Sequence, residues 1–521
     1  MKQDKINKYN FYYYINAEIE KFLQHVSLNY SARLTKSEIN RICQIIVNFS
    51  YHSLLKISAK IENIQDSLNF CEIDEYIQVD NLKININKGV FKLNLKYRIE
   101  IVFYSITYCF YALKNMIKGF LFGYKEKKTK HTIVSDLAIH QYYSNENIKE
   151  LKNAIDADRF PLLKEADYIL LKSKVFHNLK FDNLSFYWNP IFGIFSEIKW
   201  NVLDLIYLSF SLFFFLLKEL FFIFFSESRF LLLEDRVKQQ IVSFLTKFDL
   251  IEYFIITNSE CISQELYLSN TPNKNFKTAL VWYSTNSKLF KYKKKYADPN
   301  ETSFPWLKLI NVDLHFIWNL DQKNWLVDLG SQSELKIFGP ILLENPYKKA
   351  DSNIFNEEYF NIIIFDVTPV SPKFHATFFS HSYIFYSLEN TIKIINDTLD
   401  WAKNKKAKVY MKNKRETTEI HSREYAEFIE KCIAQRQLHH INYDISIDFI
   451  LDSKIKFVLC SPFTSVSSFA AYHQKKTAYY DPASVLECNF VLENNQFFLS
   501  GKSELHDLLD EQYLEFLKKE F

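Results

Sequence analysis

Short apolar runs alternate with segments of helical length and pattern from residue 359 to residue 480, and this alternation is the strongest constraint on the fold. The apolar runs lie at 359–365, 407–412, 438–443, 456–460 and 477–480, with helical patterns between them at 387–404, 422–436, 446–453 and 465–474. Strands joined by helical crossovers of this length form a parallel sheet with helices on both faces. We therefore predict a parallel α/β domain in this part of the chain.

The segment before residue 346 predicts a second α/β domain. A chain of 521 residues is too long for one hydrophobic core. Strand-like runs lie at 250–259, 277–287, 312–320 and 335–342. The predicted order is a helical region with a hairpin and a hydrophobic segment at 1–130, a first α/β domain at 131–346 with an insertion at about 198–226, a second α/β domain at 347–500, and a final amphipathic helix at 501–521.

Two segments without charge, 101–113 and 205–217, allow three interpretations. Each is shorter than the ~20 apolar residues that a membrane-spanning helix needs. The first interpretation is contact with the inner face of a membrane, which the Lys-rich stretch 124–131 would suit. The second is a buried core helix in a chain that is rich in Phe. The third is a true span, which would place Lys218 and Glu219 in the bilayer.

The composition excludes several classes of protein. A net charge of +3, with 24% charged residues, argues against a general nucleic-acid binder. The seven cysteines are scattered without metal-ligand spacing, so we expect neither disulfides nor a zinc site. The chain has only seven glycines and contains no Gly-rich phosphate loop. The N-terminus does not resemble a signal peptide, so we expect a cytoplasmic protein.

Polar side chains gather where the predicted strands of the second domain end, which is the edge at which open parallel sheets bind ligands. The stretch "CSPFTS" ends the strand at 456–460 with a proline and several hydroxyls. A helix that begins at Thr464 or Ser465 would direct its first N–H groups outward, which makes an anion site without glycine. The candidate phosphate-binding residues are Lys412, Arg415, Ser461, Thr464, Ser465, Ser467 and Asp481. An ordinary helix cap beside a solvated lysine explains the same pattern.

The stretch "CSPFTSVSSFAAYHQKKTAYYDP" resembles the signature of the polysaccharide-biosynthesis proteins named for their PFTS motif, and the likeness extends over about 245–490. More remotely, the C-terminal half is similar to bacterial sialyltransferases and Kdo transferases of the GT-B kind, which have two Rossmann-like domains. That likeness implies a metal-independent glycosyltransferase in which Thr464 and Ser465 hold the CMP part of the donor. The His-Pro element of those enzymes is absent, because this chain has Lys412-Asn413-Lys414 at that place.

We therefore expect a bacterial glycosyltransferase of capsule or O-antigen biosynthesis that is peripheral to the inner membrane. Its donor would be a nucleotide sugar, most simply a CMP-linked acidic sugar, and its acceptor a glycan or a lipid-linked glycan. It would need no metal or further cofactor and bind no nucleic acid. The general base would be a carboxylate or histidine of the first domain, with Glu260, Asp313 and His315 as candidates. A nucleotide-sugar epimerase of the same shape and a non-catalytic assembly protein are the alternatives.

Overall fold

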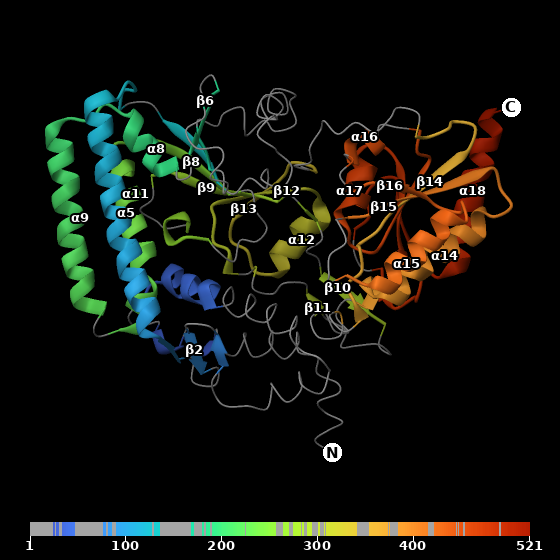
Figure 1. The fold of residues 1–521 in the computed structure, drawn as a ribbon, viewed down its shortest axis with the longest axis horizontal. Helices are drawn as coiled ribbons and strands as arrows, with labels where there is room; N and C mark the ends of the chain where they lie inside the picture. Colours follow the sequence, from blue (N-terminus) through green and yellow to red (C-terminus); the bar gives the residue numbers. More distant parts are fainter. Residues whose placement is uncertain are drawn as a thin grey trace, which may run out of the picture.

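The computed structural model describes most of the chain from residue 24 onward. The described residues are 24–26, 28–30, 34–46, 77–79, 82–85, 90–127, 130–135, 168–170, 180–181, 184–187, 190–223, 226–256, 264–269, 275–282, 284–285, 289–293, 301–302, 307, 309–340, 354–372, 375, 384–414, 421–443, 445, 447–451, 454–488 and 491–520. Figure 1 shows two sheet-containing halves, with a group of long helices at the edge of the first half.

The first half contains an eight-stranded sheet of order β13-β12-β9-β8-β4-β5-β7-β6. Its strands are β4 His131–Ser135, β5 Tyr168–Leu170, β6 Lys180–Phe181, β7 Leu184–Tyr187, β8 Ile251–Ile256, β9 Lys277–Val281, β12 Leu314–Ile317 and β13 Glu334–Ile337. All neighbouring strands are parallel except β6 and β7. The order of the parallel strands reverses between β4 and β8, as it does in a Rossmann-like domain.

The second half contains a six-stranded, all-parallel sheet of order β16-β15-β14-β17-β18-β20. The strands are β14 Phe360–Phe365, β15 Ala407–Lys412, β16 His439–Ile441, β17 Phe457–Cys460, β18 Lys476–Asp481 and β20 Gln496–Ser500. Numbered along the chain, the order is third, second, first, fourth, fifth, sixth, which is the Rossmann order. The prediction of an α/β fold with two Rossmann-like domains is confirmed.

Helices cover both faces of the second sheet. They are α14 Leu388–Ala402, α15 Arg423–Ala434, α16 Ile447–Leu451, α17 Ser465–Tyr472 and α18 Lys502–Glu520. Figure 1 shows α14, α15 and α18 on the outer side and α16 and α17 on the side that faces the first half. Strand β14 is buried at every position: Ile362 and Ile364 belong to one core cluster, and Ile363 and Phe365 to the other. This alternation explains why the strand is apolar from Ile362 to Phe365, with the buried Asn361 as its one polar residue.

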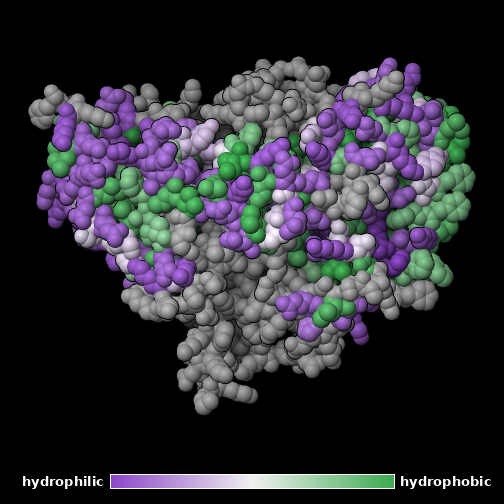
Figure 2. Space-filling model, turned by 180° about the vertical axis from the view of Figure 1, so that it is seen from behind, coloured by the Kyte–Doolittle hydropathy of each residue, from purple (hydrophilic) through white to green (hydrophobic). Residues whose placement is uncertain are grey.

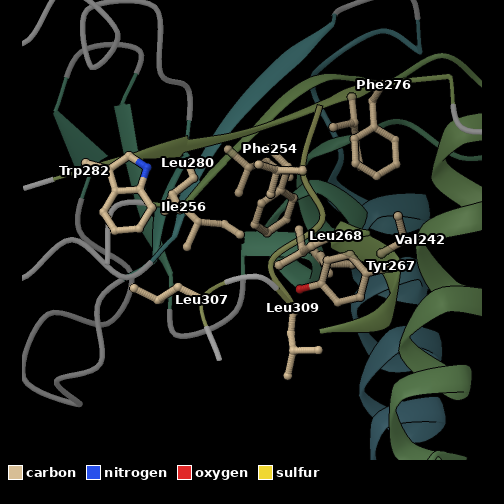
Figure 3. Close-up of a cluster of buried hydrophobic side chains, with 14 of the residues drawn as sticks. Val242, Phe254, Ile256, Tyr267, Leu268, Phe276, Leu280, Trp282, Leu307 and Leu309 are labelled. Atoms are coloured by element: carbon tan, nitrogen blue, oxygen red, sulfur yellow. The ribbon is translucent and has the colours of Figure 1, made fainter. Parts of the chain in front are cut away.

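The core of the first half lies between its sheet and a helix. Helix α11 (Leu233–Lys247) and the short helix η4 (Leu266–Leu268) pack against β8 and β9. Figure 3 shows this cluster, with side chains from the strands directed toward Val242 of α11 and Tyr267 of η4. These large side chains occupy the interior, so the first sheet provides a rigid support for the loops at its edges.

Contacts between the two halves join them directly. Strand β10 (Leu289–Tyr292) of the first half pairs antiparallel with β19 (Leu486–Glu487) of the second, and β11 (Glu301–Thr302) completes this small sheet. Helix α12 (Leu320–Asp328) adds a second contact, because its N-cap residue Asn319 donates to Glu493 Oε1 at 2.6 Å. The two halves are therefore joined by a small shared sheet and by a hydrogen bond from the start of α12.

Two of the long helices contain the segments that the sequence marks as hydrophobic. Segment 101–113 lies in α5 (Leu95–Phe122), and segment 205–217 lies in α9 (Val202–Ile223). Helix α8 (Pro190–Glu197) packs closely on α5, since a Cβ at Gly119 would come within 2.1 Å of the Phe195 carbonyl oxygen. Of the helices in the described residues, α9 is the one that is long and apolar enough to cross a membrane.

The remaining elements near the N-terminus are small. Strands β1 (Ile77–Val79), β2 (Leu82–Asn85) and β3 (Val90–Leu93) form an antiparallel sheet in the region where a hairpin is predicted. Helix α10 (Glu227–Leu231) connects α9 to α11. The predicted domain boundary near residue 346 lies outside the described residues.

Candidate functional site

The order of the second sheet reverses between β14 and β17, and this position is the ligand-binding crevice of a Rossmann-like domain. Phe365 of β14 and Cys460 of β17 are paired neighbours at the carboxyl ends of their strands. The chain continues into Asp366 and Thr368 after β14 and into Ser461 after β17. All three residues are buried. Of the candidate residues, Ser461 therefore lies at the switch point, beside Asp366 and Thr368.

The motif Pro462-Phe463-Thr464-Ser465 forms a strained turn between β17 and α17. Phe463 has a φ of 62°, in the left-handed region that few residues other than glycine adopt. Thr368, which follows the neighbouring strand, has a φ of 47°. Strain of this kind costs about 1–3 kcal/mol per residue and tends to cluster at binding sites. The Phe463 ring, 2% exposed, packs on Phe385 and Tyr479 with ring centroids at 5.4 and 6.1 Å, and this packing holds the turn.

Thr464 stands at the N-cap position of α17, but its hydroxyl does not cap the helix. The Oγ1 atom donates instead to the Ser461 carbonyl oxygen at 2.9 Å, which closes the turn on itself. The capping role expected for this side chain is therefore not the one it has here. The first-turn N–H groups of α17 do not use the threonine hydroxyl as an acceptor.

Ser465 connects the motif to the first domain. Its Oγ lies 2.8 Å from the Ser284 Oγ and accepts a hydrogen bond from the backbone N–H of Thr285 at 2.9 Å. Gln322 of α12 fixes this loop from behind, since its Nε2 donates to the Ser284 carbonyl oxygen at 3.0 Å. The buried Thr285 hydroxyl has no hydrogen-bond partner among the described residues. The start of α17 thus faces a polar loop that follows β9, at the junction of the two domains.

Asp366 is the buried carboxylate of the switch point. It accepts hydrogen bonds from the Tyr425 hydroxyl at 2.5 Å, the Lys414 backbone N–H at 3.0 Å and the Thr368 hydroxyl at 3.2 Å. Burial raises the pKa of the Asp366 carboxyl, and these donors oppose that rise. Because it ties the ends of β14 and β15 together, Asp366 fixes the backbone around the crevice.

The predicted cationic residues differ in their surroundings. Lys412 lies level with Phe365 in the sheet, on the strand next to the switch point, and is 3% exposed. Its Nζ donates to the Tyr443 carbonyl oxygen at 2.7 Å. The ammonium group therefore contacts the loop that follows β16, on the side of β15 away from β14 and the switch point. Arg415 lies outside the described residues.

Ser467 and Asp481 have structural contacts. The Ser467 hydroxyl lies 3.1 Å from the Thr477 hydroxyl and accepts a hydrogen bond from Gln496 Nε2 at 2.9 Å. Asp481, at the end of β18, accepts a hydrogen bond from the Leu486 N–H at 2.8 Å, and burial raises the pKa of its carboxyl. Ser467 thus links α17 to β18 and β20, and Asp481 holds the loop that follows β18.

The candidate bases of the first domain are not gathered at the crevice. Asp313 lies at the amino end of β12, opposite the ligand-binding edge, and accepts from the Thr278 N–H at 2.6 Å and hydroxyl at 2.9 Å. His315 is 1% exposed inside the sheet, where its Nδ1 accepts from Trp282 Nε1 at 3.0 Å. Burial lowers the pKa of His315 to about 3. These surroundings argue against proton transfer by either residue, and Glu260 lies outside the described residues.

Sequence reasoning did not select Asp366, Ser284 or Thr285 as site residues. Each follows the carboxyl end of a parallel strand, β14 or β9, and this position was the available signal. The described residues contain no group of three or more His, Cys, Asp or Glu side chains placed to hold a metal ion.

Comparison with known families decides the assignment. A family model described as "Polysaccharide biosynthesis PFTS motif protein" matches residues 215–509, which is more than half of the chain. The chain belongs to the polysaccharide biosynthesis PFTS motif family. The match includes the strained turn, the strands β8, β9, β12 and β13 of the first sheet, and the whole second sheet. In this PFTS protein the motif lies at the switch point and contacts the opposite domain.

Other comparisons add little to the family assignment. The chain has 8% identity and a TM-score of 0.35 to a solved structure of a UDP-glucosyltransferase from Polygonum tinctorium with 3,4-dichloroaniline, with 75% of this chain and 91% of that chain covered. A GtfA/B complex gives 9% identity and a TM-score of 0.30, with 53% of each chain covered. Scores this low carry no argument about activity. No curated protein matches the chain.

Proposed function

We propose that this PFTS protein is a metal-independent glycosyltransferase of surface-polysaccharide biosynthesis, capsule or O-antigen, that uses a nucleotide-activated sugar. The observation that carries the proposal is the position of the PFTS turn. The turn lies at the switch point of one Rossmann-like domain, and Ser465 lies 2.8 Å from Ser284 of the other domain. A donor held there would present its sugar to the first domain.

The chemistry follows from the groups at this edge. The N–H groups at the start of α17 favour an anion, and the hydroxyls of Thr464 and Ser465 can rotate toward it. The Lys412 ammonium would add positive charge from β15, which is separated from β17 by β14. Hydrogen-bond donors held beside the phosphate stabilise the negative charge that develops as the sugar–phosphate bond breaks. The leaving nucleotide then needs no metal ion to neutralise it.

The donor and acceptor are the finer part of the proposal. We propose a CMP-linked acidic sugar as donor and a glycan or lipid-linked glycan as acceptor, at the inner face of the membrane. The acceptor hydroxyl needs a base from the first domain. Glu260 is the remaining candidate, because it follows β8 in the sequence and β8 is the sheet neighbour of β9, whose loop contacts the motif.

A nucleotide titration tests the proposal. Thermal shift and calorimetry with CMP, CDP, UDP and GDP would be measured for the wild-type chain and for Thr464→Ala/Ser465→Ala. A ligand at 100 times its Kd stabilises the native state by about 2.7 kcal/mol, so CMP should raise the Tm clearly. Ser503→Ala is the matched control, because Ser503 lies in the first turn of α18, exposed and away from the motif.

The outcomes separate the parts of the proposal. Binding of CMP that the double variant loses and Ser503→Ala retains would support a CMP-sugar transferase. Preferential binding of UDP or GDP would overturn the donor and retain the transferase. Absence of a response to every nucleotide, in a wild-type chain that unfolds cooperatively, would overturn the transferase. The epimerase alternative predicts a changed sugar on the nucleotide in place of transfer to a glycan.

A further inference from the structure

Helices α5 and α9 present a continuous apolar surface to solvent. They pack against each other and against α11, and their outward side chains are almost all aliphatic or aromatic. This outer apolar face consists of Leu95, Ile99, Phe103, Tyr104, Phe110, Tyr111, Ile117, Phe120, Leu121 and Phe122 of α5 and of Val202, Leu203, Ile206, Tyr207, Phe210, Phe213, Phe214, Leu217 and Phe221 of α9. Figure 2 shows hydrophobic residues along the edge that these helices form, at the right of that view. Such a surface on a folded chain marks an interaction site.

The polarity of α9 is the reverse of that of a surface helix in a water-soluble protein, where charged residues face solvent. Its two carboxylates, Asp204 and Glu219, point into the protein and are buried. Asp204 is paired with Lys127, and Glu219 is paired with Arg236 at 2.8 Å. The helix therefore keeps its carboxylates away from the surroundings and exposes its apolar residues. A lipid environment favours this arrangement, and water does not.

The charges that remain on the outer side have one sign. The exposed charged residues of α5 and α9 are Lys96, Lys114, Lys118 and Lys218. The third carboxylate of these two helices, Glu100, is half-buried, and its Oε1 lies 4.0 Å from Lys96 Nζ. Lysine side chains can extend from an apolar surface to headgroup phosphates, and anionic lipids attract them. The chemistry of the face fits an anionic leaflet.

The neighbouring helix excludes a simple membrane span. Helix α11 packs along both α5 and α9 and carries Glu234, Asp235, Arg236 and Lys238. If α9 crossed the bilayer, these charges would be drawn into the hydrocarbon region with it, at a high cost. A flat orientation avoids this cost, because only the outer side of α5 and α9 enters the lipid and α11 stays on the protein side.

We propose that α5 and α9 form a monotopic platform whose outer apolar face lies in one anionic leaflet of a membrane. The proposal rests on the proposed function in one respect, because the proposed function places the protein at the inner face of the membrane. It identifies the surface that contacts the membrane and states that only the outer side of α5 and α9 enters the lipid. It does not depend on which nucleotide sugar the protein uses. The nucleotide titration needs no lipid, so the failure of one proposal is distinguishable from the failure of the other.

Vesicle flotation of the full chain tests the platform. Phosphatidylcholine vesicles with and without phosphatidylglycerol would be compared for wild type and for Phe210→Ser/Phe214→Ser. The two rings are 58% and 62% exposed, so their loss should leave the fold and the Tm almost unchanged. The matched control is Tyr472→Ser/Leu514→Ser, which removes two apolar side chains that are 59% and 57% exposed on the second domain.

We expect wild type and the control to float with anionic vesicles and the Phe210/Phe214 variant to partition at least about tenfold more weakly. Lys114→Gln/Lys118→Gln/Lys218→Gln should lose the preference for phosphatidylglycerol and its dependence on salt. Equal flotation of the apolar-face variant and the control would overturn the proposal, and so would a wild-type chain that binds neither vesicle.

Two further results would replace the proposed occupant. A concentration-dependent dimer that the Phe210/Phe214 variant abolishes, without vesicle binding by wild type, would assign the face to a second copy of the chain. Chemical labelling of the bound protein from both sides of the vesicle membrane would indicate a spanning α9 and overturn the flat orientation. Labelling from the outer side only, together with selective loss of flotation in the variant, is the result that the platform requires.

Discussion

Replacing Phe463 by alanine and by glycine tests whether the PFTS turn stores backbone strain. Both variants remove a buried ring that contacts Phe385 and Tyr479, at a cost of about 3–5 kcal/mol. They differ in the backbone. At a φ of 62°, alanine bears the left-handed penalty of roughly 1–2 kcal/mol and glycine does not. Glycine loses about 0.5–1 kcal/mol through its more flexible unfolded chain. Phe463→Gly should therefore be more stable than Phe463→Ala by about 0.5–1 kcal/mol.

Phe469 is the matched control, because it is a second buried phenylalanine, 4% exposed, in the helix that follows the turn. In a helix, alanine is more stable than glycine by about 1 kcal/mol. The order of the two variants should thus reverse between positions 463 and 469, with a combined difference of about 1.5–2 kcal/mol.

Native-state hydrogen exchange on the amides of α17 is the suitable assay, because it reports the free energy of local opening in a chain of two domains. The four variants would be compared under the same conditions. If alanine is the more stable residue at both positions by the same amount, Phe463 is not held in the left-handed region, and the strained turn is refuted.

Three further perturbations test the buried polar groups. Since burial lowers the pKa of His315 to about 3, the unfolded chain binds one more proton than the folded chain below pH 6.5. The free energy of unfolding should therefore fall as the pH drops from 6.5 to 5, by up to about 1.4 kcal/mol per pH unit. His315→Asn should flatten this part of the pH profile of stability. Asp366→Ala should cost about 1–3 kcal/mol by leaving the Tyr425 hydroxyl buried without its acceptor, and adding Tyr425→Phe should recover about 1 kcal/mol in a double-mutant cycle; strict additivity would contradict the hydrogen bond. Glu219→Ala should lower the free energy of unfolding by about 2 kcal/mol because it removes an inward carboxylate from a buried arginine, whereas Lys218→Ala, on the exposed side, should change it by less than about 0.5 kcal/mol; equal effects would contradict the reversed polarity of α9.

The second sheet was predictable because its physics is local. A strand such as β14, buried on both faces, favours a run of apolar residues, and the sequence "FNIIIF" is apolar except for Asn361, whose Nδ2 donates to two backbone carbonyl oxygens. The helices between the strands are predicted by the helical spacing of their apolar residues. The position of the PFTS turn was predictable for the same reason. Proline cannot continue a central strand, so Pro462 marks the end of β17 in the sequence.

The directions of the site side chains were not predictable in the same way. Ser465 bonds to Ser284, 181 residues away in the sequence, and no local pattern encodes that contact. Thr464 satisfies a general capping pattern, yet its hydroxyl donates to Ser461 because a strained turn brings that carbonyl oxygen close. Asp313 was misplaced because it stands at the start of the run 312–320, before β12 (Leu314–Ile317), and not at the carboxyl end where ligands bind. The start of a short strand and its end lie on opposite edges of a sheet.

The proposed contacts with lipid and with the donor belong to different halves of this PFTS protein. Helix α5 precedes β4, and α8 to α11 lie between β7 and β8, so the apolar platform belongs to the first domain. The PFTS turn belongs to the second domain, and the small sheet β11-β10-β19 joins the two. A water-soluble nucleotide sugar would therefore bind to the domain that lacks the platform, while a lipid-linked acceptor would approach from the domain that carries it. The loop Ser284–Thr285 contacts Ser465 where the two paths meet, so a change there should affect transfer more than the binding of either substrate.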